Sequence, residues 1–210
     1  MERLKIKYVG ILRQIIFILC IVIFIPINSN AQKKILNYDV TYKGDIIGYL
    51  NLTELTTGRK VFYGLKSEVK ASYIFSYHSY TNENSVFENG NMLYSFYYQK
   101  ENGKEKINET RIAGNYFKLI SDGNVDSQIS NLIRFNILQL YGNCPGKSIK
   151  VYSTHYQRFL DFEKMTENEY RLVLPSGNYN YYHYKNGICT HVDVPRRFFT
   201  IHFILKKIQE

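Results

Sequence analysis

Three Asn-Gly pairs constrain this sequence more than any other feature, because each favours a sharp reversal of the chain. They are Asn89-Gly90, Asn102-Gly103 and Asn186-Gly187. A type I′ turn needs positive φ at both central residues, and Asn followed by Gly tolerates that backbone best. Such a turn joins two antiparallel strands. The three pairs therefore predict three β-hairpins.

The segments around these turns have the pattern of strands. From Leu36 to Lys43, aromatic and aliphatic residues alternate with polar ones, the period of a strand with one buried face. The chain contains 20 Tyr and 13 Phe, which suit the pleated surface of a sheet. Further strands are predicted at Ile46–Leu55, Arg59–Val69, Ser72–Tyr80, Ser85–Glu88, Asn91–Gln99, Ile107–Ala113, Tyr116–Ser121, Ser148–Ser153, Phe159–Met165, Glu169–Leu174, Tyr179–Lys185, Ile188–Val194 and Phe198–Leu205.

One segment departs from the period of two. Between Ser127 and Tyr141 the apolar residues recur at helical spacing, Asp126 or Ser127 can cap the start, and Gly142 is placed where a helix ends. The apolar stripe consists of Ile129, Leu132, Ile133, Ile137 and Leu140. We expect one α-helix near 127–141 that covers an apolar face of the sheet.

These patterns predict an all-β fold: a curled antiparallel sheet or open β-barrel of about a dozen strands with one covering α-helix. No internal repeat or low-complexity linker divides residues 32–210. A stretch of this length can bury a sizeable core as one domain.

The N-terminus has the pattern of a signal peptide. Basic residues precede the apolar run Ile15–Ile25, and small residues at Ser29 and Ala31 suit a signal peptidase. We expect residues 1–31 to be removed, so that an exported chain begins at Gln32 in the periplasm or outside the cell, with no transmembrane span. An uncleaved leader that anchors the domain to the inner membrane stays open. Lipidation at Cys20 is disfavoured, because bulky residues precede it.

The formal net charge of +9 does not indicate nucleic-acid binding. Part of it belongs to the leader, and the rest is scattered, as in Lys100–Lys106, where Lys and Glu alternate. A nucleic-acid site needs clustered basic residues. We expect no nucleic-acid partner.

The hairpin at Asn186-Gly187 allows a map of side-chain directions. A two-residue turn pairs Tyr184 with Cys189 and His183 with Thr190, and strict alternation then places His183 on the opposite face from Cys189 and His191. This argues against a metal site there, and we expect no metal or cofactor. The predicted core face carries Tyr179, Tyr181, His183, Lys185, Ile188, Thr190, Val192 and Val194. A one-residue register slip would reverse the two faces.

Motifs for catalysis are absent from the sequence. There is no Gly-x-Ser-x-Gly elbow and no glycine-rich phosphate loop. Asp161 and Glu163 share a strand face and could form a carboxylate pair, although neighbouring Lys164 favours a solvated edge. After leader removal Cys144 and Cys189 are the only cysteines, and an oxidising compartment would allow a disulfide between them, with two separate thiols as the alternative.

Several short motifs resemble the domain of unknown function 6134 family, a family of secreted bacterial proteins. The motifs are Tyr38-Asp39-Val40, Gly44–Gly48, Phe87–Gly90, Val151–Ser153 and Leu174–Gly177, followed by Asn180, Tyr182, Tyr184 and Asn186-Gly187. The sequence departs from the family at Asn143-Cys144-Pro145, where members carry an acidic residue before the proline. The resemblance implies an exported, β-rich domain of unknown activity.

Two classes of function stay open. The first is a non-enzymatic binding module of the cell envelope that holds an apolar or amphipathic ligand, such as a lipophilic small molecule, between helix and sheet. The second is a structural or interaction domain with a filled core and an envelope protein as its partner. A weaker third is a hydrolase of envelope polymers. The candidate ligand-lining residues are Ile129, Leu132, Ile133, Ile137, Leu140, Tyr179 and Tyr181.

Overall fold

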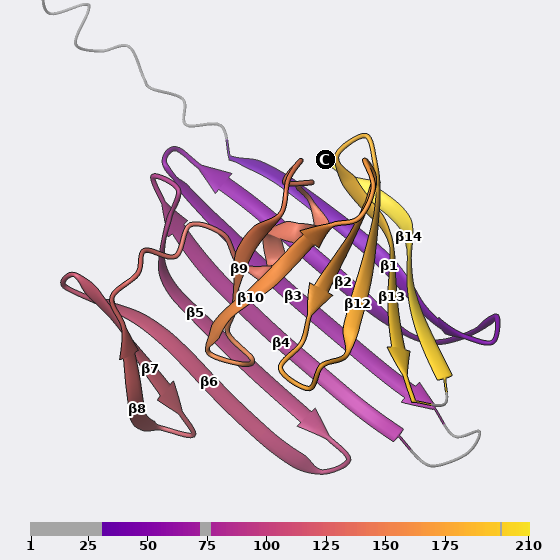
Figure 1. The fold of residues 1–210 in the computed structure, drawn as a ribbon, viewed down its shortest axis with the longest axis horizontal. Helices are drawn as coiled ribbons and strands as arrows, with labels where there is room; N and C mark the ends of the chain where they lie inside the picture. Colours follow the sequence, from indigo (N-terminus) through magenta and orange to yellow (C-terminus); the bar gives the residue numbers. More distant parts are fainter. Residues whose placement is uncertain (1–30, 72–76, 198) are drawn as a thin grey trace, which may run out of the picture. The chain divides into compact units, whose positions relative to one another are not determined.

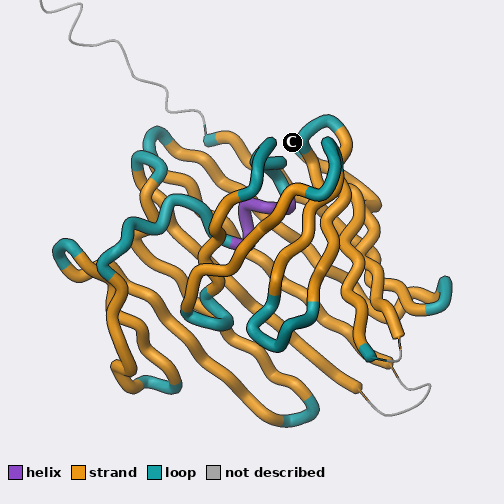
Figure 2. Tube along the Cα trace, viewed as in Figure 1, coloured by secondary structure: helices purple, strands orange, loops and turns teal. Residues whose placement is uncertain are grey.

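The computed structural model describes residues 31–71, 77–197 and 199–210, which form strands and one short 3-10 helix (Figures 1 and 2). Residues 1–30 of the predicted leader, residues 72–76 of the predicted strand Ser72–Tyr80, and Phe198 lie outside the described residues. The elements are β1 (Gln32–Tyr42), β2 (Asp45–Thr57), β3 (Lys60–Ala71), β4 (Tyr77–Glu88), β5 (Asn91–Glu101), β6 (Lys104–Ala113), β7 (Tyr116–Ser121), β8 (Asn124–Ile129), η1 (Ile137–Tyr141), β9 (Ile149–Ser153), β10 (Arg158–Lys164), β11 (Glu169–Val173), β12 (Tyr179–Lys185), β13 (Ile188–Arg196) and β14 (Phe199–Gln209). In this part of the chain no helix has the length and apolar character to cross a membrane.

All the strands belong to one antiparallel sheet of 14 strands, so the predicted all-β, open architecture is confirmed. The order is β8-β7-β6-β5-β4-β3-β2-β1-β14-β13-β12-β11-β10-β9. Each strand neighbours the next in the chain, except that β8 and β9 are not paired and the first strand, β1, pairs with the last, β14. The sheet is not closed, because β8 and β9 are its two ends. It curls so that β9–β12 lie in front of β2–β5, with η1 between them (Figure 1).

The three Asn-Gly hairpins are confirmed. Glu88 pairs with Asn91, Glu101 with Lys104 and Lys185 with Ile188, which leaves two-residue turns. Both turn residues have positive φ, for example +50° at Asn89 and +74° at Gly90. Local backbone preference therefore sets the register of these strand pairs.

The predicted covering helix at 127–141 is wrong. The first part of that segment belongs to β8, which pairs with β7 through the turn at Asp122-Gly123. An extended stretch follows, and only the five residues of η1 are helical. Pairing of β8 with β7 overrides the helical spacing of the apolar residues, because tertiary contacts outweigh a local pattern.

The extended stretch links the two halves of the sheet across its interior. The carbonyl oxygen of Ile133 accepts a hydrogen bond from the Met92 amide at 2.8 Å, and that of Phe135 accepts one from the Tyr152 amide at 2.9 Å. The Nδ2 of Asn108 on β6 donates to the carbonyls of Thr154 and His155. These bonds satisfy interior backbone groups that lie outside the ladders.

The main core lies on the concave side of the sheet. Leu138 and Leu140 of η1 are fully buried, so the short helix fills space that the predicted helix was expected to cover. The largest fully buried side chains are Tyr38, Tyr152, Tyr170, Phe117, Phe162, Leu36, Leu52, Met92, Ile133, Leu138, Leu140 and Leu172.

Candidate functional site

The predicted ligand-lining residues do not form one lining. Ile133 and Leu140 are fully buried in the core, and Ile129 and Ile137 pack against it half-buried. Leu132 points the other way and is 56 % exposed. Two further candidates, Tyr179 and Tyr181, lie on the outer face of β12, where the Arg171 guanidinium stacks 4.8 Å from the Tyr179 ring centre.

The predicted core face of the β12–β13 hairpin needs correction. On β12 the buried residues are Tyr182 and Tyr184, so the tyrosines at 179 and 181 and also His183 face outward. On β13, Cys189, Val192 and Val194 are buried. Two inward residues three positions apart, Cys189 and Val192, mark a β-bulge, and the pairing shifts there: Tyr184 pairs with Cys189, but His183 pairs with His191.

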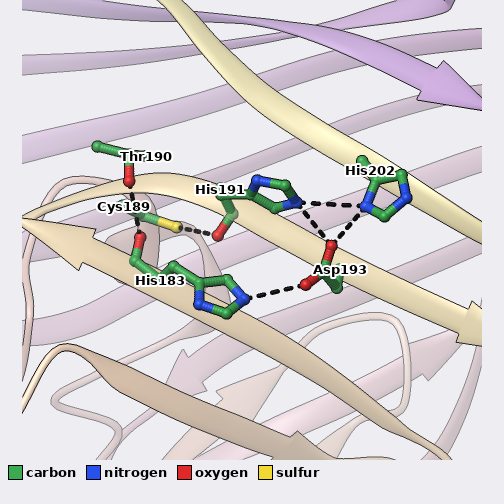
Figure 3. Close-up of polar contacts among 6 residues, drawn as sticks. All are labelled: His183, Cys189, Thr190, His191, Asp193 and His202. Atoms are coloured by element: carbon green, nitrogen blue, oxygen red, sulfur yellow. Dashed lines mark hydrogen bonds and ion pairs between the residues drawn. The ribbon is translucent and has the colours of Figure 1, made fainter. Parts of the chain in front are cut away.

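The bulge brings three histidines and one aspartate together on the outer face (Figure 3). Asp193 Oδ1 lies 2.6 Å from His191 Nε2 and 2.5 Å from His202 Nδ1. The two histidine nitrogens are 3.3 Å apart. The other carboxylate oxygen, Oδ2, lies 3.0 Å from His183 Nε2. We name these four residues the histidine–aspartate cluster.

Strand pairing explains why the cluster converges. His202 on β14 stands directly opposite Asp193 on β13, and His191 directly opposite His183 on β12. Burial alone would raise the pKa of Asp193, but hydrogen bonds from His202, His183 and His191 outweigh it and lower that pKa. Each side chain of the cluster keeps about a third of its surface exposed or less, so solvent reaches the cluster from one side.

A groove of about 370 Å³ lies at the other end of this half of the sheet. We name it the Leu132 groove, and it is lined by Leu132, Arg134, Phe135, Pro145, Ile149, Lys150 and Phe159. Lys150 Nζ lies 2.7 Å from Asp161 Oδ1. No described residue forms an ion pair with Arg134. The groove therefore has an apolar wall and, among the described residues, a cation without an ion-pair partner.

A buried carboxyl group lies in the interior, away from both sites. Glu83 on β4 is 7 % exposed, and burial raises its pKa to about 7. Its ladder neighbours are Leu65 and Tyr97. The His155 ring contacts the Tyr97 ring edge-on, and burial, followed by the charge of Lys106, lowers the pKa of His155 to about 4. Nothing in the polar pattern of β4 distinguishes Glu83 from solvent-facing residues.

The remaining candidates from the sequence are a carboxylate pair and two cysteines. Asp161 and Glu163 form ion pairs with Lys150 and Arg171 of neighbouring strands. Cys144 and Cys189 both carry free thiols, and burial raises the pKa of Cys189 to about 12. The Cys144 amide donates to the Gly187 carbonyl at 2.9 Å, so the two cysteines belong to one region; their disulfide stays a prediction.

Comparison with known proteins supplies a family and a fold. No curated protein matches this sequence. The chain is similar in structure to a beta-barrel-like protein of domain of unknown function DUF1849 from Brucella abortus, with a TM-score of 0.54 and 8% sequence identity over 84% of this chain and 97% of that one. This likeness shows the fold alone. The model of the family described as "Domain of unknown function (DUF6134)" matches residues 38–206, so the chain belongs to that family.

Proposed function

We propose that the protein is a non-enzymatic binding module of the cell envelope, and that its ligand is an amphipathic molecule with an apolar body and an anionic head. The Leu132 groove is its site. The observation that carries the proposal is an exposed leucine at the mouth of an apolar groove that also holds a cation without an ion-pair partner among the described residues.

The apolar wall supplies the driving force. Leu132 is 56 % exposed beside Phe135, Ile149 and Phe159. Covering apolar surface stabilises a complex by about 25 cal/mol per Å² before the costs of association. A volume of about 370 Å³ holds a fused aromatic group or a stretch of alkyl chain, and because the groove is open at the surface, the rest of a longer ligand can extend out of it.

The charges select the head group. The Arg134 guanidinium can form two parallel hydrogen bonds with a carboxylate or phosphate. Lys150 is already paired with Asp161, so Arg134 is the stronger contact. Arg134 and Lys150 are the only ionisable groups of the lining, which suits binding and offers no acid–base pair for catalysis.

Binding of 11-(dansylamino)undecanoic acid and of its uncharged methyl ester tests this proposal by fluorescence titration. We expect Leu132→Asp to weaken both probes at least about 10-fold, because it places a charge in the apolar wall. Arg134→Glu is expected to weaken only the acid. The matched control is Val125→Asp on β8, since Val125 is 63% exposed and lies outside the groove lining. If neither probe binds, or if Val125→Asp acts like Leu132→Asp, the proposal is wrong.

A second candidate is an interaction domain that adds a partner strand to β8. Among the described strands β8 pairs only with β7, and most of its residues are exposed. An open edge of this kind can accept an extended peptide. Cross-linking of a Gln128→Cys variant to a defined envelope protein, together with failure to bind either probe, would select this candidate.

A further inference from the structure

The histidine–aspartate cluster lies on β12–β14, is separated from the groove strands β9 and β10 by β11, and has a different chemistry from the Leu132 groove. From the short distances between the imidazole nitrogens and the carboxylate oxygens of this cluster, we infer that His191, His202 and Asp193 bind one divalent transition-metal ion of the Zn²⁺ class. His183 positions Asp193 through the second carboxylate oxygen of Asp193. This site is independent of the proposed ligand-binding function.

The spacing of the donor atoms fits a metal ion. Zn–N bonds of about 2.0–2.1 Å in a tetrahedral site place neighbouring ligand atoms roughly 3.3–3.4 Å apart. His191 Nε2 and His202 Nδ1 are 3.3 Å apart. The three ligand atoms, one from each residue, all lie within 4.8 Å of one another.

The Asp193 carboxylate supplies the third ligand atom. Asp193 Oδ1 lies at hydrogen-bond distance from both nitrogens, at 2.6 and 2.5 Å. An ion between the three atoms would need this oxygen to withdraw by about 1 Å, which a small rotation of the side chain supplies. No backbone movement is required, because the three residues stand on adjacent hydrogen-bonded strands.

His183 contacts the oxygen of Asp193 that is not a proposed metal ligand. Its Nε2 lies 3.0 Å from Asp193 Oδ2, the oxygen that faces away from the other histidines. A ligating carboxylate whose second oxygen accepts a hydrogen bond is held in one orientation, and loss of such a partner costs metal affinity. His183 is therefore a positioning residue, and it reaches this place only because of the bulge in β13.

The donor set also selects the class of ion. Imidazole nitrogens suit Zn²⁺ and its transition-metal neighbours, whereas Ca²⁺ and Mg²⁺ prefer oxygen ligands throughout. Three protein ligands leave the fourth position open to solvent, and the partly exposed cluster allows water to reach it. The site therefore exchanges its ion with solution.

Isothermal titration of the tag-free, chelator-treated chain with ZnCl₂, and separately with CaCl₂, measures the affinity. We expect one Zn²⁺ per chain and at least about 100-fold weaker binding of Ca²⁺. His191→Gln, His202→Gln and Asp193→Asn should each weaken Zn²⁺ binding at least about 10-fold, and His183→Gln about 10-fold. The matched control is His78→Gln, because the His78 ring also pairs with a carboxylate, Glu68, but no second histidine or carboxylate of the described residues pairs with that ring; the Zn²⁺ affinity of this variant should equal that of the parent.

A second measurement on the parent chain identifies the ligand atoms directly and does not depend on the folding of variants. In ¹⁵N-detected imidazole spectra, Zn²⁺ should shift Nε2 of His191 and Nδ1 of His202. Zn²⁺ that binds without shifting these two nitrogens would overturn the assignment. So would the absence of binding at about 100 µM Zn²⁺, or unchanged affinity in a folded variant that lacks all three ligands; the cluster would then be a network of hydrogen bonds.

Discussion

Replacement of Glu83 by Gln tests how strongly the interior of the sheet opposes a charge. The Glu83 carboxyl group is buried, and its pKa is raised to about 7 from the ordinary value of 4.5. Between these two pH values the folded chain holds a proton that the unfolded chain has released. The free energy of unfolding therefore falls as the pH rises from about 4.5 to 7, and the penalty is complete above pH 7.

The size of the effect follows from the difference between the ordinary pKa of 4.5 and the raised pKa of about 7. At about 1.36 kcal/mol per unit this gives about 3 kcal/mol. The glutamine of the variant carries no charge at any pH, so Glu83→Gln should be about 3 kcal/mol more stable than the parent at pH 8, relative to their difference at pH 4. His155 has the opposite dependence, because its lowered pKa removes stability as the pH falls from 6.5 towards 4. That contribution is common to both chains and cancels in the comparison.

Urea denaturation followed by circular dichroism at pH 4, 5.5, 7 and 8.5 measures the difference. The control is Glu88→Gln on the same strand, where the side chain is 39% exposed; its effect should stay within about 0.5 kcal/mol at every pH. A constant difference between Glu83→Gln and the parent over the whole pH range would refute the argument, since it would mean that Glu83 is solvated in the folded state.

Three further outcomes are expected. Gly48→Ala should destabilise the fold by about 1–3 kcal/mol or more in urea denaturation, because the added Cβ would lie 2.1 Å from a backbone carbonyl oxygen of β3. Gly64→Ala should cost less, because the nearest atoms to the added Cβ there belong to side chains. Tyr38→Phe should cost about 1–3 kcal/mol by the same assay, since the buried Tyr38 hydroxyl donates to the Cys189 carbonyl at 2.6 Å. N-terminal sequencing of the exported chain should begin at Gln32; retention of the intact leader would contradict cleavage.

The sequence predicted the parts of the fold that depend on local backbone chemistry. The turn at Asn89-Gly90 needs only positive φ at two residues, so its hairpin could be placed from the sequence alone. The segment around Ile129 could not, because its helical spacing competes with pairing to β7, and that partner becomes available only once the sheet has formed. Propensity is a weak guide where tertiary contacts decide.

The candidate sites were harder to predict for the same reason. Strict alternation placed His183 and His191 on opposite faces of the hairpin. The bulge that brings them to one face includes Thr190, and the sequence has no glycine there that would have indicated a bulge. His202 lies beside these two histidines only because β14 pairs with β13. Leu132 was expected to lie on a buried helical stripe, but it is 56% exposed, because the chain is extended there and not helical.

The position of β14 has a consequence for how the chain acquires its structure. Every other ladder joins strands that follow one another in the sequence, and such hairpins can form early because their ends are close. The β1–β14 ladder instead pairs Ile35 with Gln209, across almost the whole domain. The meander β1–β8 and the meander β9–β13 can therefore form separately, but no strand ladder joins them, and the edges of β1 and β13 stay exposed, until β14 has been synthesised. Formation of this one long-range ladder is the slow, aggregation-sensitive step that we expect for the complete domain.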